Sequence, residues 1–415
     1  MERVVLTGMG IISPLGNDVE TFWTRLSRGE SGISLIDTLD TTRHKVKIAG
    51  SVSAFDANER FGAKEARRMD RFCQFALAAA DEAVTRSGLD LNQVNKERMG
   101  VYVGSGIGGI QTLISQTETL SARGPERISP TLVPMMIPNM AAALISITYG
   151  TRGPTLAPVT ACSIGNTAIG EAFFHIQAGR SDVIIAGGTE AALTDISLAS
   201  FANATALSTR ACAPSEASRP FDRDRDGFVM AEGAGILVLE SLSHALKRGA
   251  PILAEVIGYG ASSDAYHMVA TPADGQGAAL AMQAALAEAG LAPADIDVIS
   301  AHATSTIVGD RSETAAIKQV FGDHAYRVPV TANKSMTGHM LGASGGAEAI
   351  ALVKMLEQGL IPPTINLNHP DPECDLDYVP NTARYSDLRI GISNSFGFGG
   401  HNSAIVLKRF EHDGK

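Results

Sequence analysis

Short runs of β-branched and apolar residues alternate with longer segments of helical periodicity along the whole chain. This alternation is typical of α/β proteins, in which strands form a sheet and helices cover it. We expect strands at residues 3–6, 100–103, 183–186, 235–239, 252–259, 298–301, 328–331, 390–393 and 403–408. Helices are expected at residues 19–28, 67–87, 164–178, 277–289, 312–321 and 343–358.

The alternation begins again near residue 250, where residues 256–260 repeat the pattern of residues 4–8. We therefore expect two similar halves, residues 1–250 and 251–415. No Pro- or Ser-rich linker separates them, so independently tethered domains are not indicated. Residues 110–150 are harder to assign and are interpreted as an insertion, with an interface as one possible role.

Composition excludes several classes of function. The net charge of −10 argues against a general nucleic-acid binder. No run of about 18 apolar residues occurs, so no membrane insertion is expected, and the N-terminal residues do not resemble a signal peptide. The four cysteines, Cys73, Cys162, Cys212 and Cys374, have no metal-ligand spacing. Such sparse cysteine usage indicates a reducing compartment, and a cytoplasmic location is predicted.

Two short patterns imitate ligand loops. Residues 104–109 match the G-x-G-x-x-G pattern of dinucleotide loops, but no ribose-binding acid follows. Residues 222–227 imitate the start of a calcium loop, but its twelfth position is Gly233 and the acid is misplaced at Glu232. We therefore expect neither a cofactor nor a metal.

Cys162 stands where a predicted buried strand, residues 155–161, gives way to the helix at 164–178. The N–H groups and dipole at a helix N-terminus stabilise a thiolate, and the sharp turn is expected to expose the sulfur. The other three cysteines lack this context. They are interpreted as structural, because free cysteines commonly behave as small buried hydrophobic residues.

Two histidines follow far downstream. His302 ends the strand at 298–301, and the carboxyl end of a strand is where α/β proteins place ligands. His339 is expected to open a glycine-rich helix, whose dipole favours the neutral imidazole. A neutral imidazole can donate a hydrogen bond to a carbonyl that becomes an enolate. Either histidine alone would be unremarkable in a core or turn, but together with Cys162 they indicate acyl transfer with carbon–carbon bond formation.

Lys334 and Glu348 form the remaining candidate pair. Lys334 lies in a stretch of small, neutral residues before His339, and Glu348 lies on a helix face otherwise made of Gly and Ala. A charge on such a face needs a partner, so an ion pair between the two is predicted.

Seven motifs together resemble the β-ketoacyl-acyl-carrier-protein synthases of the condensing-enzyme family, type II. They are Val4-Val-Leu-Thr-Gly-Met-Gly, Gly104-Ser-Gly-Ile-Gly-Gly, Thr160-Ala-Cys, Arg219-Pro-Phe-Asp-Arg-Asp-Arg-Asp-Gly-Phe, His302-Ala-Thr-Ser-Thr, Lys334-Ser-Met-Thr-Gly-His and Asn394-Ser-Phe-Gly-Phe-Gly-Gly. The resemblance runs essentially from end to end. It implies a thiolase fold, with two βαβαβαββ halves in a five-layered αβαβα arrangement, usually as a homodimer.

The resemblance also implies an acyltransferase that condenses an acyl thioester with malonyl-acyl carrier protein, as in fatty-acid elongation. Cys162 would become acylated, and His302 and His339 would hold the malonyl thioester carbonyl while carbon dioxide leaves. Backbone N–H groups of Cys162 and Phe398 would form the oxyanion hole, and Phe398 would act as a gate. Replacing either histidine by alanine is expected to impair condensation more than acylation.

Further implied roles concern binding. Lys334 and Glu348 would organise the site electrostatically. The implied substrate and pantetheine contacts are Thr304, Thr306, Ile107, Phe201 and Phe398. The implied carrier-docking surface comprises Lys64, Arg67, Arg68 and Arg127. The partner would be an acyl carrier protein, and a heterodimer with a ketosynthase-like subunit is an alternative to the homodimer.

Four positions depart from the family pattern. Ala303 stands where glycine is usual, Val269 where threonine is common, Thr205 where arginine is frequent, and Glu126 replaces a basic residue. These changes keep a specialised polyketide or polyene ketosynthase as an alternative. A non-catalytic subunit of the chain-length-factor type is disfavoured, because such subunits typically lack the nucleophile.

Overall fold

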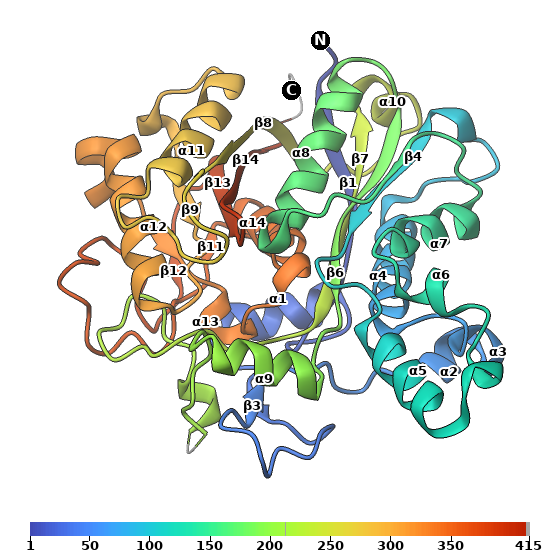
Figure 1. Ribbon diagram of the computed structural model, residues 1–415. Coiled ribbons are helices and arrows are strands. Elements are labelled where there is room, and N and C mark those ends of the chain that lie inside the picture. The colour runs from blue at the N-terminus through green and yellow to red at the C-terminus, as the bar shows by residue number, and fades with distance from the viewer. Residues whose placement is uncertain (212, 412–415) are drawn as a thin grey trace.

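Ten strands form one continuous sheet in the computed structural model, which describes residues 1–211 and 213–411 of the chain (Figure 1). One half of the sheet contains β1 (Val4–Ile12), β4 (Met99–Gly104), β5 (Thr155–Leu156), β6 (Val183–Glu190) and β7 (Gly233–Ser241). The other half contains β8 (Ala254–Ser263), β9 (Val298–Ser300), β10 (Val330–Thr331), β13 (Ile390–Gly397) and β14 (His401–Arg409).

The two halves of the sheet meet where β1 pairs antiparallel with β8 through three residue pairs. Outward from this junction the strands follow in the orders β1-β7-β6-β4-β5 and β8-β14-β13-β9-β10. In both halves the first two pairings are antiparallel and the next two are parallel. Each half therefore repeats the strand order and the strand directions of the other.

Helices form three layers around the strands (Figure 1). In the outer layers, α4 (Arg71–Ser87) and α7 (Met140–Tyr149) cover the first half, and α11 (Gln276–Ala289) and α12 (Ile307–Phe321) cover the second. Between the halves lie α8 (Ile164–Gln177) and α14 (Ser344–Gln358), which contact strands of both. This is the αβαβα arrangement that the resemblance implied.

Glycine allows the two central helices to touch. A Cβ atom on Gly165 of α8 would lie 2.3 Å from the backbone nitrogen of Gly346 in α14. Any side chain at this crossing would separate the helices, and with them the two halves of the sheet. The sequence thus places its smallest residues where the central layer is tightest.

The remaining elements are short or peripheral. Helices α1 (Val19–Ser27), α2 (Ala57–Phe61), α3 (Ala63–Ala66), α5 (Ile110–Arg123), α6 (Leu132–Met136), α9 (Asp195–Asn203), α10 (Leu242–Lys247) and α13 (Lys334–Thr337) complete the helical set. Two-stranded sheets pair β2 (Ser34–Leu35) with β3 (Ile48–Ala49) and β11 (Leu360–Ile361) with β12 (Arg384–Tyr385). Among residues 1–211 and 213–411, no helix combines the length and the apolar character needed to cross a bilayer.

One predicted element is wrong, and one predicted helix begins later than expected. The buried strand expected at residues 155–161 is reduced to β5, two exposed residues at the edge of the sheet. The helix expected from residue 67 begins only at Arg71, because the Asp70 carboxylate caps it by accepting from the Phe72 N–H. The other predicted strands and helices are present, with bounds shifted by a few residues.

Candidate active site

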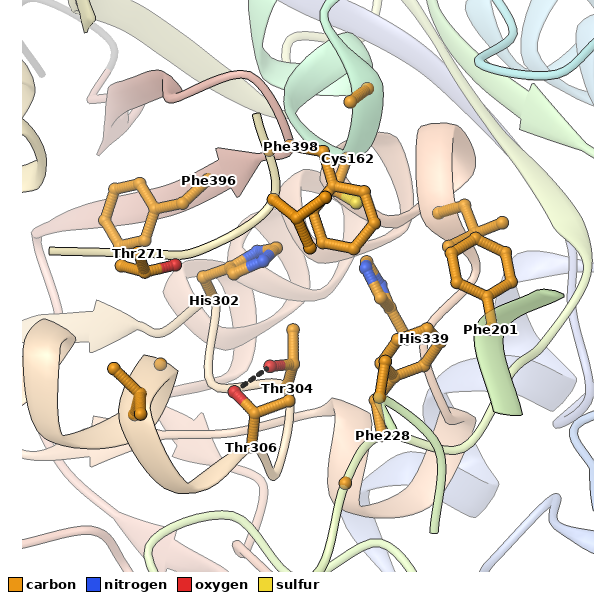
Figure 2. Close-up of a pocket in the computed structure, with 18 of the residues that line it drawn as sticks. Cys162, Phe201, Phe228, Thr271, His302, Thr304, Thr306, His339, Phe396 and Phe398 are labelled. Atoms are coloured by element: carbon orange, nitrogen blue, oxygen red, sulfur yellow. Dashed lines mark hydrogen bonds between the residues drawn. The ribbon is translucent and has the colours of Figure 1, made fainter. Parts of the chain in front are cut away.

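One cavity of about 660 Å³ is lined by three of the candidate catalytic residues, Cys162, His302 and His339, while Lys334 and Glu348 lie behind its wall (Figure 2). Cys162 reaches it from the first half, and His302, His339 and Phe398 reach it from the second. Figure 2 shows the two imidazoles approaching each other from opposite sides, with Cys162 above them. Groups separated by more than a hundred residues of sequence therefore face a common space.

Cys162 lies in a short 3₁₀ turn, η3 (Ala161–Ser163), that leads directly into α8, so the predicted position at a helix N-terminus is confirmed. The predicted exposure of the sulfur is wrong, because the residue is only 8% exposed. Burial raises the pKa of the thiol to about 12. The Lys334 ammonium and the backbone N–H groups of Phe398 and Cys162 oppose that rise, while Glu190 adds to it. The resting group at neutral pH is therefore the thiol and not the predicted thiolate.

The two imidazoles are buried, with ring centroids 5.4 Å apart and planes nearly perpendicular. Burial and the nearby Lys334 ammonium hold the pKa of each well below its usual range. Both rings are therefore neutral, as predicted. The predicted cause was wrong for His339, which precedes the turn η7 (Leu341–Ala343) and does not open α14.

Hydrogen bonds at Nδ1 determine which ring nitrogen of each imidazole carries the hydrogen. The Lys334 Nζ lies 3.4 Å from His302 Nδ1. An ammonium group only donates, so Nδ1 accepts and the hydrogen of His302 resides on Nε2. His339 Nδ1 lies 3.1 Å from the Ser344 hydroxyl, which can donate in the same way. In this arrangement each ring carries a donor N–H at Nε2.

The predicted ion pair between Lys334 and Glu348 is present, with Nζ and Oε1 in direct contact. Both residues are almost wholly buried, at 1% and 3% exposure. Burial raises the pKa of Glu348 to about 7, while the Lys334 ammonium acts to lower it. The pair thus anchors the ammonium that donates to His302.

The substrate contacts implied by the resemblance also line the cavity. The hydroxyls of Thr304 and Thr306 are hydrogen bonded to each other at 3.1 Å (Figure 2). Phe201 stands 6.2 Å from Phe398, measured between ring centroids, and Ile107 contributes to the same wall. These side chains lie together around the space that opens beside Cys162.

The atypical positions Ala303, Val269 and Thr205 are found at the cavity as well. Ala303 has φ +27° and Thr205 has φ +54°, conformations that side-chain-bearing residues rarely adopt. Three of the four departures from the family pattern therefore fall on the cavity wall, whereas the fourth, Glu126, is exposed and does not line the cavity.

Several aromatic and polar residues of the cavity were missed from the sequence. Phe228 stacks edge-on against His339 and Phe396 packs against His302, with centroid distances of 5.3 and 5.5 Å. The polar residues missed are Thr271, Glu190, Asp226, Asp264, Ser312 and Asn402. Glu190 alone carried a usable signal, since it is an acid at the end of an apolar strand.

The four basic residues assigned to carrier docking lie elsewhere. Lys64, Arg67, Arg68 and Arg127 are exposed, and none of them lines the cavity. Arg68 pairs with Glu65 in α3, and Arg127 ends the turn η2 (Pro125–Arg127) that follows α5. Cys73 and Cys374 are buried in apolar clusters, as predicted, and Cys212 lies outside the described residues.

Comparison with known families decides the relationship. The family described as "Beta-ketoacyl synthase, N-terminal domain" matches residues 1–245, and "Beta-ketoacyl synthase, C-terminal domain" matches residues 253–368. The chain belongs to the β-ketoacyl synthase family. The predicted family and its thiolase-like fold are thereby confirmed.

Two named β-ketoacyl synthases are similar over almost their whole length. A "3-oxoacyl-[acyl-carrier-protein] synthase 2" of Synechocystis is 49% identical over 410 residues, and one of Staphylococcus aureus strain COL is 50% identical over 410 residues. Each alignment covers 99% of both chains. A solved type II polyketide ketosynthase, in complex with its acyl-carrier protein and bound to a hexaketide, is 36% identical with a TM-score of 0.90. That match covers 99% of this chain and 100% of the other.

Proposed function

We propose that the protein catalyses the decarboxylating condensation of an acyl thioester with malonyl-acyl carrier protein, which gives a 3-oxoacyl-acyl carrier protein and elongates fatty-acid chains. The observation that carries this proposal is the shared cavity, in which one thiol meets two neutral imidazoles. The relatives named as elongation synthases are 49–50% identical, whereas the polyketide ketosynthase is 36% identical. Elongation is therefore favoured over the polyketide alternative, and a non-catalytic subunit is disfavoured because Cys162 and both histidines are present.

In the first step the Cys162 sulfur attacks the acyl carbonyl carbon. A new carbon–sulfur bond forms, the bond to the carrier's sulfur breaks, and the thiol proton passes to that departing sulfur. Backbone N–H groups of Cys162 and Phe398, which face the sulfur, donate to the oxygen as it becomes negative. These donors offset the cost of forming negative charge in a buried site.

In the second step the Nε2–H groups of His302 and His339 donate to the malonyl thioester carbonyl. Loss of carbon dioxide leaves an electron pair in the enolate, and hydrogen bonding to the enolate oxygen lowers the barrier. The enolate carbon then attacks the acyl-cysteine, and Cys162 leaves as a thiolate with the electrons of the broken bond. This thiolate takes up a proton from solvent and returns to the resting thiol. Lys334 keeps His302 in the required tautomer, and Glu348 holds Lys334 in place.

Substrate binding follows from the cavity wall. The hydroxyls of Thr304 and Thr306 contact the pantetheine arm of the carrier. Ile107 and Phe201 line the space for the acyl chain. Phe398 is 38% exposed at the cavity and acts as a gate that orders the two substrates.

We further propose that an acyl carrier protein docks on the basic surface formed by Lys64, Arg67, Arg68 and Arg127. Carrier proteins of this kind are expected to be acidic, so docking would be driven by electrostatic steering. The proposed location is the cytoplasm, where such carriers and their substrates are available to an elongation enzyme.

We propose a homodimer, with a heterodimer as the alternative. β5 ends the ten-stranded sheet as an exposed edge, and an unpaired edge strand is a template for pairing with another chain. Leu156 of β5 and the nearby Val159 are exposed apolar residues, and no side chain of α5 is fully buried within this chain. The division into halves at residues 1–250 and 251–415 is proposed on the repeated strand order of the sheet.

The test is mass spectrometry of Cys162 after incubation with a panel of saturated, unsaturated and polyketide acyl-carrier proteins, followed by malonyl-carrier protein. Acylation by saturated chains and release of a product two carbons longer support fatty-acid elongation. Acylation by unsaturated or polyketide chains alone supports the specialised ketosynthase. The variant Cys162→Ala serves as the control, because it retains the cavity but lacks the nucleophile.

A further inference from the structure

Glu190 is a wholly buried carboxylate at the cavity that the proposed reaction does not use. It is the last residue of β6, which runs parallel to β4. Because the carboxyl ends of parallel strands lie at one edge of a sheet, Glu190 sits beside the loop that follows β4. That loop, residues 105–109, carries Ile107 into the cavity wall.

Four hydrogen bonds converge on the Glu190 carboxylate. Oε1 accepts from the Ser105 hydroxyl at 2.7 Å and from the Ile107 N–H at 3.1 Å. Oε2 accepts from the Gly106 N–H at 3.0 Å and from the Gly342 N–H at 3.2 Å. Three of the four donors belong to the loop, and the fourth belongs to η7 on the other half of the molecule.

The charge on Glu190 is balanced by these donors. Burial raises the pKa of Glu190, and the four hydrogen bonds act to lower it. Backbone N–H groups cannot accept a hydrogen bond, so an acceptor-only carboxylate matches them, whereas an amide or a protonated acid would leave two donors facing each other. Glu190 therefore fits this position as an anion.

The space around the carboxylate is restricted. A Cβ atom on Gly106 or on Gly342 would lie 3.0 Å from Oε2, which is closer than ordinary contact. Gly342 follows Leu341, which lines the cavity at φ +48°. The carboxylate thus connects two cavity walls that share no other covalent or sheet connection at this point among the described residues.

We infer that Glu190 is a positioning residue that ties the Ile107 loop to the Leu341–Gly342 segment and thereby sets the acyl-chain selectivity of the cavity. The inference rests on the proposed function, since it concerns the acyl chain delivered to Cys162. Glu190 acts through the backbone of the two segments and through its charge, and it takes no part in bond making or breaking.

Glu190 has two proposed effects, the hydrogen bonds that join the two segments (the tether) and its negative charge. Two substitutions distinguish these effects. Glu190→Gln removes the charge and places an amide NH₂ against N–H donors, so both functions are lost. Glu190→Asp keeps the charge but is one methylene shorter, so it cannot span both segments. Glu82→Gln is the matched control, because Glu82 also accepts from two backbone N–H groups, those of Ile11 and Val19, but does not line the cavity.

The first measurement is the ratio of Cys162 acylation rates for a long-chain and a short-chain saturated acyl-carrier protein. In Glu190→Gln and Glu190→Asp we expect the preference for one chain length over the other to weaken by about fivefold. This is the change produced by one lost hydrogen bond of about 1 kcal/mol. The control Glu82→Gln is expected to keep the native ratio. Thermal unfolding of all three variants reports any general loss of stability.

The second measurement is the rate of Cys162 alkylation by iodoacetamide at a fixed pH of about 8, well below the thiol pKa. Loss of the Glu190 charge lowers the pKa of Cys162, so Glu190→Gln is expected to react faster than the native protein. Glu190→Asp and Glu82→Gln retain the local charge at the thiol and are expected to react at the native rate. Alkylation needs no condensing activity, so it tests the inference even if the proposed reaction is wrong.

An unchanged acylation ratio in both Glu190 variants would overturn the inference, whether or not they are less stable. A native alkylation rate in Glu190→Gln would overturn the electrostatic part. If Glu190→Gln does not fold, Ser105→Ala replaces it, because this change removes one donor of the tether and should shift the acylation ratio in the same direction. No shift in a folded Ser105→Ala together with none in Glu190→Asp would refute the tether.

Discussion

Replacing Glu348 by glutamine tests how the buried charges serve the site. The substitution leaves the Lys334 ammonium 1% exposed and without its carboxylate. Removing one partner of a buried ion pair costs about 3–5 kcal/mol of folding stability, because the remaining charge stays desolvated. We therefore expect Glu348→Gln to unfold at a clearly lower urea concentration than the native protein.

Activity should fall for a separate reason. A buried ammonium without a counter-ion favours its neutral form, and a neutral amine no longer holds the His302 Nδ1 as an obligate acceptor. A hydrogen bond to a charged group contributes about 1.5–3 kcal/mol, so condensation should slow by between about tenfold and a hundredfold. The predicted loss thus exceeds what a single neutral hydrogen bond would give.

The double variant Lys334→Met/Glu348→Gln separates the two effects. It contains no unpaired buried charge, so its urea midpoint should return toward the native value, while its condensing activity stays low. Native stability and activity in Glu348→Gln would refute the role of the pair. Recovery of activity in the double variant would show that the Lys334 charge is not needed.

Four further predictions concern the histidines, the thiol, the cavity wall and the docking surface. His302→Ala and His339→Ala should each slow condensation about a hundredfold, because each loses one donor worth about 3 kcal/mol. The transfer of a radiolabelled acyl group to Cys162 should be less affected. Equal loss of both steps would contradict the assignment of the two histidines to condensation. Because burial raises the pKa of the Cys162 thiol to about 12, its alkylation rate should still rise steeply above about pH 10, where the rate of an ordinary thiol levels off, and a plateau near about pH 10 would argue against a buried resting thiol. Ala303→Gly should raise stability by about 1 kcal/mol in urea unfolding, since it relieves a positive φ, and a loss of stability would disprove strain at this position. Arg67→Glu should raise the apparent KM for the carrier protein most strongly at low salt, and an effect independent of salt would exclude electrostatic docking.

Much of the architecture could be predicted because the signals are local. Apolar runs and helical periodicity located the strands and helices, and the restart near residue 250 agrees with the repeated strand order. The failures occurred where tertiary context decides. Residues 155–161 have strand-forming side chains, but only Thr155–Leu156 pair, at the outer edge of the sheet.

Most of the predicted site residues lie together, and the predicted ion pair and neutral imidazoles are present, but the ionisation of the nucleophile was predicted wrongly. Position at a helix N-terminus suggested an exposed thiolate at Cys162, yet burial outweighs the backbone N–H groups and keeps the thiol protonated. Burial by distant segments is not encoded near residue 162, so no local pattern could reveal it. Glu190 had a local signal, as an acid at the end of an apolar strand, but its role was missed because its four donors come from segments up to 152 residues away.

The measurement that tests the central claim most directly is the mass of the peptide containing Cys162 after each half of the reaction. Incubation with a saturated acyl-carrier protein should add one acyl group to this cysteine. Subsequent malonyl-carrier protein should remove that group and yield a 3-oxoacyl chain two carbons longer, with release of carbon dioxide. An acyl group on another residue, or an acyl-Cys162 that malonyl-carrier protein fails to discharge, would contradict a condensing enzyme built on this thiol and these two imidazoles.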